Sequence, residues 1–373
     1  MLTVSRALGV AIGLVASLVV FSLLFAGEST RFDEAALGEN ESTFAVVDGV
    51  RVHCSDLSDS AECIAGAERC AECRRYLWLG NSQLHAINQR KPGDRSAPQL
   101  LHMRLRASGR YVVTFSEPNA NLQEHLILFA YLLPRLKPDV LLLPVVFDDF
   151  RETGVRAGIS PALRDDLTRA ALSRSSIGAA LLTEGERAPQ DDEDLAGVAA
   201  TVQEKSERGL TGWLQERWPL WAARPQARGE IALFLYELRN TVFGIKPTTA
   251  RRVIPGRFAK NWSALEAMIA LARANRVDVV LYIVPLRNDV RIPYVPGEYS
   301  AFKEKLRREF ADREGVRLLD LEHVVDNALW GTKAATSVGG APEYDFMHFQ
   351  ARGHQELAQA LYEAISGAEG GSR

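Results

Sequence analysis

A serine at the end of an apolar run is the first residue whose position suggests chemistry. The segment Tyr76–Leu84 reads YLWLGNSQL, and residues that favour a helix follow it. This pattern predicts a buried strand, a tight turn and a helix, with Ser82 at the C-terminal tip of the strand. Reactive side chains collect at such strand ends in open parallel sheets, and backbone N–H groups at the helix start can stabilise an oxyanion there. The alternative is that Ser82 only caps the helix, as serine often does.

A second reactive pattern lies near the end of the chain. In the segment Tyr344–His354 (YDFMHFQARGH), Asp345 and His348 are three residues apart, just before a predicted helix. One short loop can therefore supply an imidazole that takes the proton of a serine and a carboxylate that holds the tautomer of that imidazole. The order serine, aspartate, histidine is one of several that produce this geometry. We therefore predict Ser82 as nucleophile, His348 as general base and Asp345 as the orienting carboxylate.

The elements that must position these residues alternate between strand and helix. Residues 154–260 interrupt the alternation and are too many for a simple crossover, so we expect a helical insertion there. The alternation itself predicts a doubly wound α/β sheet. The predicted strands are the run that begins at Tyr76 and residues 111–116, 140–147, 277–285 and 316–320, and the predicted helices are residues 122–136, 261–275, 298–310 and 352–365.

The N-terminal region has the pattern of a membrane anchor. Residues 7–26 contain no charged side chain, and about 20 apolar residues are what a helix needs to cross a bilayer. Arg6 precedes this stretch, which favours a body outside the cytoplasm. We expect an uncleaved anchor at residues 1–26, a flexible polar tether at residues 27–43, and a periplasmic body on the cytoplasmic (inner) membrane. A cleaved signal peptide is the alternative, but the small-x-small pattern of a cleavage site is missing.

Residues 44–75 hold all four cysteines of the chain. Residues 44–52 resemble a small hairpin, because their Asp-Gly pair suits a type I′ turn. The cysteines lack the paired C-x-x-C spacing of a zinc ribbon, and two disulfides are the better interpretation for an extracytoplasmic protein. The sequence alone leaves three pairings open, of which Cys54–Cys63 with Cys70–Cys73 is one.

The serine block and the closing D-x-x-H block together resemble the SGNH/GDSL hydrolase superfamily. Leu79–Ser82 (LGNS) departs from Gly-Asp-Ser but looks like the Gly-x-Ser variants of membrane-anchored relatives, the DltD-like and AlgX/AlgJ-like proteins. Residues 345–353 (DFMHFQARG) are similar to the closing segment of DltD. The resemblance spans residues 76–365 apart from the insertion. It implies an SGNH-type three-layer α/β/α sandwich with a five-stranded parallel sheet over residues 76–373, and an MBOAT-family transmembrane acyltransferase as partner.

The middle blocks depart from that superfamily, which usually supplies a glycine after its second strand and Gly-x-Asn-Asp after its third. Here residues 116–121 (SEPNAN) and 147–151 (FDDFR) follow those strands. Asn119 or Asn121 can donate a side-chain N–H to an oxyanion, whereas an ionised Asp148 cannot. Asp148, with its neighbours Asp149 and Arg151, is better suited to a substrate hydroxyl or to a structural ion pair.

Two further candidates for substrate contact follow the fourth predicted strand. Arg287 and Asn288 lie where ligands bind in such sheets. The sequence contains no pattern that calls for a cofactor or a metal ion.

Composition is compatible with this interpretation. The chain has 373 residues, of which 47% are hydrophobic and 24% charged, with a net charge of −3. It has no long basic block, so nothing indicates a nucleic-acid partner. We expect serine-dependent O-acyl transfer or ester hydrolysis on a cell-envelope polymer, such as a polysaccharide, through an acyl-Ser82 intermediate. The alternatives are a plain esterase or lipase-like hydrolase and a non-catalytic scaffold that assists an MBOAT acylation complex.

Overall fold

The computed structural model describes residues 40–42, 44–70, 72–156, 158–187, 249–333, 335 and 341–370. The predicted anchor at residues 7–26 lies outside this part of the chain. Within the described part, no helix is long and apolar enough to cross a membrane. The last residues of the predicted tether are not a tether, because Asn40–Ser42 forms strand β1, which pairs antiparallel with β6 (Ala86–Asn88).

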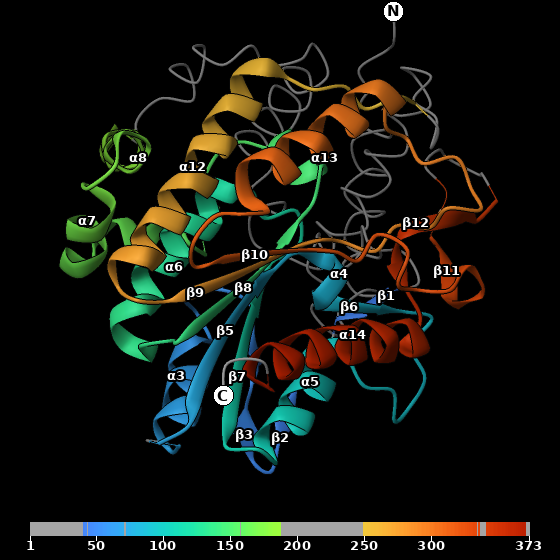
Figure 1. The fold of residues 1–373 in the computed structure, drawn as a ribbon, viewed down its shortest axis with the longest axis horizontal. Helices are drawn as coiled ribbons and strands as arrows, with labels where there is room; N and C mark the ends of the chain where they lie inside the picture. The colour runs from blue at the N-terminus through green and yellow to red at the C-terminus, as the bar shows by residue number, and fades with distance from the viewer. Residues whose placement is uncertain are drawn as a thin grey trace, which may run out of the picture. The chain divides into compact units, whose positions relative to one another are not determined.

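A parallel sheet runs through the centre of the fold (Figure 1). It contains all five predicted strands and a sixth that was not predicted. The sixth strand is β4, whose two residues, His53 and Cys54, pair with Thr114 and Phe115 of β7. The prediction of five strands was therefore one strand short, because a two-residue strand is too short to leave a pattern in the sequence. The strands in sheet order are β10 (Val316–Asp320), β9 (Asp278–Ile283), β8 (Val140–Val145), β5 (Arg74–Gly80), β7 (Arg110–Ser116) and β4 (His53–Cys54).

The central strands are apolar because helices cover both faces of the sheet. All six residues of β8 are buried, including Pro144. A proline inside a sheet removes one ladder N–H, yet β8 pairs with β5 only over Val140–Leu142. Pro144 lies beyond that stretch, opposite Tyr282 of β9. The proline therefore stands where β8 has a strand partner on one side only.

Helices cover the two faces of the sheet in different groups (Figure 1). Helices α6, α12 and α13 lie on one face, where α6 packs against α12, and α5 and α14 pack together on the other. This division follows from right-handed crossovers between parallel strands. The longer helices are α5 (Ala97–Arg106), α6 (Leu122–Leu136), α12 (Pro255–Ala274), α13 (Pro296–Phe310) and α14 (Ala351–Gly370).

Two helices begin earlier than their patterns predicted. Both α12 and α13 start at a proline, which is favoured in the first helical turn because its missing N–H would have no helical partner there. The described part of the predicted insertion at residues 154–260 is helical as expected. It contains η2 (Ser160–Arg164), α7 (Asp166–Leu172) and α8 (Ser176–Arg187), followed by the start of α12. The described residues between 40 and 187, between 249 and 333 and between 344 and 370 belong to one compact unit.

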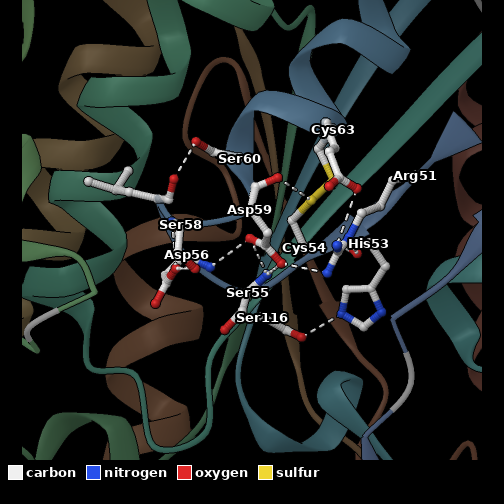
Figure 2. The surroundings of a disulfide bond; sticks show 12 residues. Arg51, His53, Cys54, Ser55, Asp56, Ser58, Asp59, Ser60, Cys63 and Ser116 are labelled. Atoms are coloured by element: carbon white, nitrogen blue, oxygen red, sulfur yellow. Dashed lines mark hydrogen bonds and ion pairs between the residues drawn. A yellow bond between two sulfur atoms is a disulfide. The ribbon is translucent and has the colours of Figure 1, made fainter.

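The cysteine-containing segment lies at the edge of the sheet, to which it contributes β4. Its predicted hairpin is confirmed: β2 (Val46–Val47) and β3 (Val50–Arg51) pair antiparallel, and the turn residues Asp48 and Gly49 have φ of 50° and 73°, as a type I′ turn requires. The cysteines pair as Cys54–Cys63 and Cys70–Cys73. The first disulfide joins β4 to α3 (Ser60–Glu68), so it fastens the edge strand (Figure 2).

Candidate active site

The turn after β5 presents Ser82 at the carboxyl edge of the sheet. Helix α4 (Ser82–His85) starts directly after the turn, and its N-cap is Asn81, whose Oδ1 accepts the backbone N–H of Gln83 at 3.1 Å. The capping interpretation of Ser82 is therefore wrong, and its hydroxyl is available for another partner. Leu84 packs closely over Gly80, because a Cβ at Gly80 would lie 2.3 Å from the Leu84 side chain.

The hydroxyl of Ser82 is paired with His348. The Ser82 Oγ lies 2.9 Å from His348 Nε2, and His348 Nδ1 lies 2.8 Å from Asp345 Oδ2. A carboxylate can only accept a hydrogen bond, so the proton is assigned to Nδ1, and Nε2 is left to accept the hydroxyl proton of Ser82. The chain separates Ser82 from His348 by 266 residues, and the fold brings them together with the polarity that serine activation requires.

Asp345 is held as a buried carboxylate. Its side chain is 2% exposed, against 14% for that of His348. Burial by itself raises the pKa of the Asp345 carboxyl, but the adjacent His348 and three hydrogen bonds outweigh burial and hold that pKa below its usual range. The backbone N–H groups of Met347 and His348 donate to Asp345 Oδ1 at 2.9 and 3.0 Å. The site therefore keeps a fixed negative charge behind the imidazole.

Two buried amides connect the serine segment to residues 345–348 of β12 (Glu343–Phe349), here called the acid–base segment. Gln83 Nε2 donates to the carbonyl oxygens of Pro285 and Met347, both at 2.9 Å. Asn88 Nδ2 lies 2.9 Å from the carbonyl oxygen of Thr332 and 3.3 Å from Asp345 Oδ2. Sequence analysis missed both residues, because each reaches partners more than 200 positions away.

Asp149 supports the cap of the serine turn. Asn81 Nδ2 donates to both of its carboxyl oxygens, at 3.1 and 3.2 Å. Asp149 is 3% exposed, and burial raises the pKa of its carboxyl well above the usual range, although the hydrogen bond from Asn81 opposes that rise. Sequence analysis placed Asp149 near an ion pair or a substrate hydroxyl; in the structure it holds the residue that precedes Ser82.

Asp148 belongs to an ion-pair cluster rather than to the serine turn. Its carboxylate pairs with Arg251 and with Arg151, the latter at 3.1 Å, and accepts the hydroxyl of Tyr294 at 3.0 Å. These contacts match the structural ion pair that sequence analysis left open for this residue.

The two predicted oxyanion asparagines have other contacts in the structure. Asn121 caps α6, with Oδ1 accepting the backbone N–H groups of Gln123 and Glu124 while Nδ2 donates to the carbonyl oxygen of Gly154 at 2.9 Å. Asn119 is exposed in the preceding turn, with φ of 58°. Within the described chain, neither side chain forms a hydrogen bond with Ser82. The engagement of Asn121 argues against its predicted role, because a capping amide is already used.

Arg287 and Asn288 lie in the segment that follows β9. Arg287 is 9% exposed, forms a two-point ion pair with Asp289 at 2.5 and 3.0 Å, and lies over the ring of Tyr344 at 4.7 Å. Its backbone N–H donates to the carbonyl oxygen of Phe346 next to Asp345. Asn288 is exposed and bonds to His323 and Asn327. Arg287 therefore lies beside the acid–base segment, whereas Asn288 bonds away from it.

The backbone N–H of Ser82 is a further polar group at the serine. For the amide of Ser82, no hydrogen-bond acceptor is found among the described residues. The same part of the chain contains no group of three or more His, Cys, Asp or Glu side chains that could hold a metal ion. The hydrogen bond between Ser82 and His348 allows proton transfer between a serine and an imidazole, and the N–H of Ser82 is a donor that could meet a developing negative charge.

Comparisons with known proteins give distant likenesses. No family model matches the sequence, and a search of curated proteins finds no match. Among solved structures, a protein from Bacteroides fragilis that is proposed to be an acylhydrolase is 12% identical with a TM-score of 0.35, covering 81% of this chain and 94% of its own. A GDSL-like lipase from Bacteroides thetaiotaomicron is 11% identical with a TM-score of 0.35, covering 82% and 99%. A family two carbohydrate esterase from Clostridium thermocellum is 9% identical with a TM-score of 0.34, covering 80% and 64%. At this distance the chemistry has to be argued from the residues themselves.

Proposed function

We propose that this chain is an SGNH-type serine esterase or O-acyltransferase that acts through an acyl-Ser82 intermediate. One observation carries the proposal: the hydroxyl of Ser82 lies 2.9 Å from His348 Nε2, while the opposite ring nitrogen lies 2.8 Å from the buried carboxylate of Asp345. A serine hydroxyl is a poor nucleophile at neutral pH unless a base takes its proton, and this is the arrangement that provides one.

In the first half-reaction the Ser82 Oγ attacks the carbonyl carbon of an ester, and His348 Nε2 takes the hydroxyl proton. The carbonyl oxygen gains negative charge, which the N–H of Ser82 can stabilise by donating a hydrogen bond. The intermediate then collapses: the ester C–O bond breaks, His348 gives its proton to the departing alcohol, and the acyl group stays on Ser82. The Asp345 carboxylate stabilises the imidazolium throughout.

The second half-reaction decides between hydrolysis and transfer. If water attacks the acyl-serine, the chain is an esterase; if a hydroxyl of a polymer attacks, it is an O-acyltransferase. We propose transfer onto a cell-envelope polysaccharide or similar polymer, with an MBOAT-family membrane protein as the source of acyl groups. The resemblance of residues 79–82 and 345–353 to the DltD-like proteins supports this choice.

The proposed location is the outer side of the cytoplasmic membrane, with residues 7–26 as a single-pass anchor. The two disulfides of the cysteine segment support an oxidising compartment. A phosphatase reporter fused after residue 43 should be active, and a reporter that works only in the cytoplasm should be silent. The reverse pattern would reject the extracytoplasmic location.

Labelling with a fluorophosphonate tests the catalytic part of the proposal. The probe should modify Ser82 in the full-length protein, and Ser82→Ala should lose both the label and the hydrolysis of p-nitrophenyl acetate. Addition of a soluble acetylatable polysaccharide then separates the two outcomes: a transferase moves acetyl onto the polymer, whereas an esterase releases acetate alone. A folded Ser82→Ala protein that keeps full turnover would leave the scaffold alternative standing.

A further inference from the structure

We infer that Gln83 and Asn88 are positioning residues that fix the acid–base segment (345–348) against Ser82. This inference rests on the proposed function and extends it, since neither residue belongs to the predicted serine, histidine and aspartate set. Both lie in the seven-residue stretch that begins at Ser82 itself. One short piece of chain thus carries the nucleophile together with two amides that hold the segment bearing its base.

Gln83 ties together the chain neighbours of the two reacting groups. It follows Ser82 in sequence, and its Nε2 donates at 2.9 Å to the carbonyl oxygen of Met347, which precedes His348. The same nitrogen donates at 2.9 Å to Pro285 at the end of β9. The Gln83 side chain is 1% exposed, so water does not compete for these bonds. The separation of the Ser82 hydroxyl from the His348 ring is therefore set partly by this side chain.

Asn88 holds the acid–base segment from the other side. Its Nδ2 lies 3.3 Å from Asp345 Oδ2, 3.4 Å from the carbonyl oxygen of His348 and 2.9 Å from that of Thr332 in β11 (Trp330–Lys333). Asn88 also packs closely against β11, because a Cβ added to Gly331 would lie 2.1 Å from Asn88 Oδ1. Asn88 therefore touches the carboxylate that orients the imidazole and the backbone that carries that imidazole.

The side-chain carbonyl oxygens of Gln83 and Asn88 support a positioning role for these residues. Gln83 Oε1 and Asn88 Oδ1 are buried and have no hydrogen-bond partner within the described protein. A buried acceptor without a partner lowers stability. Amides are thus present at a cost in stability, and what they supply is N–H groups aimed at the acid–base segment.

Donor-free variants of similar shape test the inference. Gln83→Met and Asn88→Leu remove the N–H groups, and the full-length proteins are assayed with p-nitrophenyl acetate and with a fluorophosphonate. We expect Gln83→Met to lower kcat about 100-fold and Asn88→Leu about 10-fold with KM changed less than about threefold, because small misplacements of a catalytic group reduce the rate of chemistry far more than binding. Gln83→Leu, which also lacks a side-chain donor and adds no charge, replaces Gln83→Met if the latter does not fold.

Asn261→Leu is the matched control. Asn261 is 0% exposed, and its Nδ2 donates to the carbonyl oxygens of Glu152 and Arg257 at 2.9 and 3.1 Å, outside the serine site. The Asn261→Leu variant therefore loses a buried amide that donates to two carbonyl oxygens, as the Gln83→Met variant does. We expect a lower unfolding temperature with an unchanged kcat per labelled serine.

The rate and the final extent of labelling separate positioning from folding. A positioning role predicts that every Ser82 in the variants still labels in the end, but with a smaller rate constant. A purely structural role predicts a smaller labelled fraction with the wild-type rate constant, which would overturn the inference while the wild-type label on Ser82 still stands. Failure of the wild-type protein to label would instead reject the proposed function.

Discussion

Two serine–histidine hydrogen bonds occur near the same edge of the sheet, and only one of them has the surroundings of an active site. Ser82 Oγ lies 2.9 Å from His348 Nε2, and Ser116 Oγ lies 2.6 Å from His53 Nε2 (Figure 2). Ser116 ends β7 opposite Gly80 of β5, so the two serines belong to adjacent strand ends. By residue type and distance alone, the two pairs are equivalent.

Exposure and neighbours make the difference between the pairs. Ser116 and His53 are both 0% exposed, and the ring of Phe44 packs edge-on against His53 at 5.5 Å. Ser82 is partly exposed, and the His348 ring has a buried carboxylate on its far nitrogen. Of the two pairs, only Ser82 and His348 are accessible to solvent. Access and an orienting carboxylate make the Ser82–His348 hydrogen bond a candidate for catalysis, whereas the fully buried hydrogen bond between Ser116 and His53 cross-links the interior.

Replacing each serine in turn tests whether the two pairs differ in function, and it should give the largest effect. Ser82→Ala should lower kcat for p-nitrophenyl acetate by about 10⁶-fold, the size seen when a triad enzyme loses its nucleophile. Ser116→Ala should leave kcat within a few-fold and lower the free energy of unfolding by about 1–3 kcal/mol, because it removes one partner of a buried hydrogen bond. Steady-state kinetics and urea unfolding measure both. Equal losses of activity in the two variants would erase the distinction between the pairs.

Removal of the carboxylate behind His348 should have the next largest effect. Asp345→Asn should lower kcat by about 10⁴-fold, less than loss of Ser82, because the imidazole remains while its tautomer is no longer held. Circular dichroism should show that the variant is folded. A loss as large as that of Ser82→Ala would mean that the carboxylate does more than orient the ring.

The same variant should change the response of stability to acid. The folded-state pKa of Asp345 lies below the ordinary carboxyl value of about 4. Its ionised form therefore stabilises the folded state at neutral pH, and this contribution is lost as the pH falls below about 4 toward the folded-state pKa. Urea unfolding measured from pH 7 to pH 3 should show a smaller acid-induced loss for Asp345→Asn than for the wild type. Parallel curves would contradict the depressed pKa.

Loss of the disulfide next to His53 should lower the stability of the protein without changing its catalytic rate. The Cys54–Cys63 bond closes a sequence separation of 9 residues. Replacing both cysteines by serine should lower the free energy of unfolding by about 2.5 kcal/mol, with kcat for each labelled Ser82 unchanged. Protein isolated from its own compartment should contain no free thiol among the four cysteines. Four reactive thiols, or bound zinc, would contradict the oxidised pairing.

The smallest effect is expected from His53→Gln. Glutamine can still reach Ser116 with a polar group but loses the ring contact with Phe44. The free energy of unfolding should fall by about 1 kcal/mol, and kcat should stay at the wild-type value, as thermal unfolding and steady-state assays will show. A large fall in kcat would mean that the buried pair supports the serine turn.

Local patterns were enough to predict the elements that carry the site. The abrupt end of an apolar run at Gly80 predicted a strand and a turn, because burial and helix propensity act over a few neighbouring residues. The spacing of Asp345 and His348 predicted their contact for the same reason. The pairing of the cysteines remained one of three in the sequence, and the fold selected it.

Contacts across long stretches of chain could not be predicted in this way. Asn119 and Asn121 were chosen as oxyanion donors because they follow a strand, yet Asn121 is a helix cap. Gln83 had no distinguishing pattern, since its acceptors lie 202 and 264 residues away. The residue type does not tell whether an Asn or Gln side chain is buried, and only tertiary packing decides whether its amide has a partner.

Three features of the protein could be predicted from the sequence alone. They are the alternation of strand and helix, the serine at a strand tip, and the aspartate–histidine pair near the other end of the chain. These features depend on neighbouring residues, whose hydrophobicity and hydrogen-bonding preferences act locally. The tertiary structure brings Ser82 to His348. It also extends the sheet by a two-residue strand and places Gln83 and Asn88 in contact with the acid–base segment, neither of which the sequence pattern predicts. Each of these depends on the order of strands in the sheet, because that order brings distant backbone and side-chain groups within hydrogen-bonding distance.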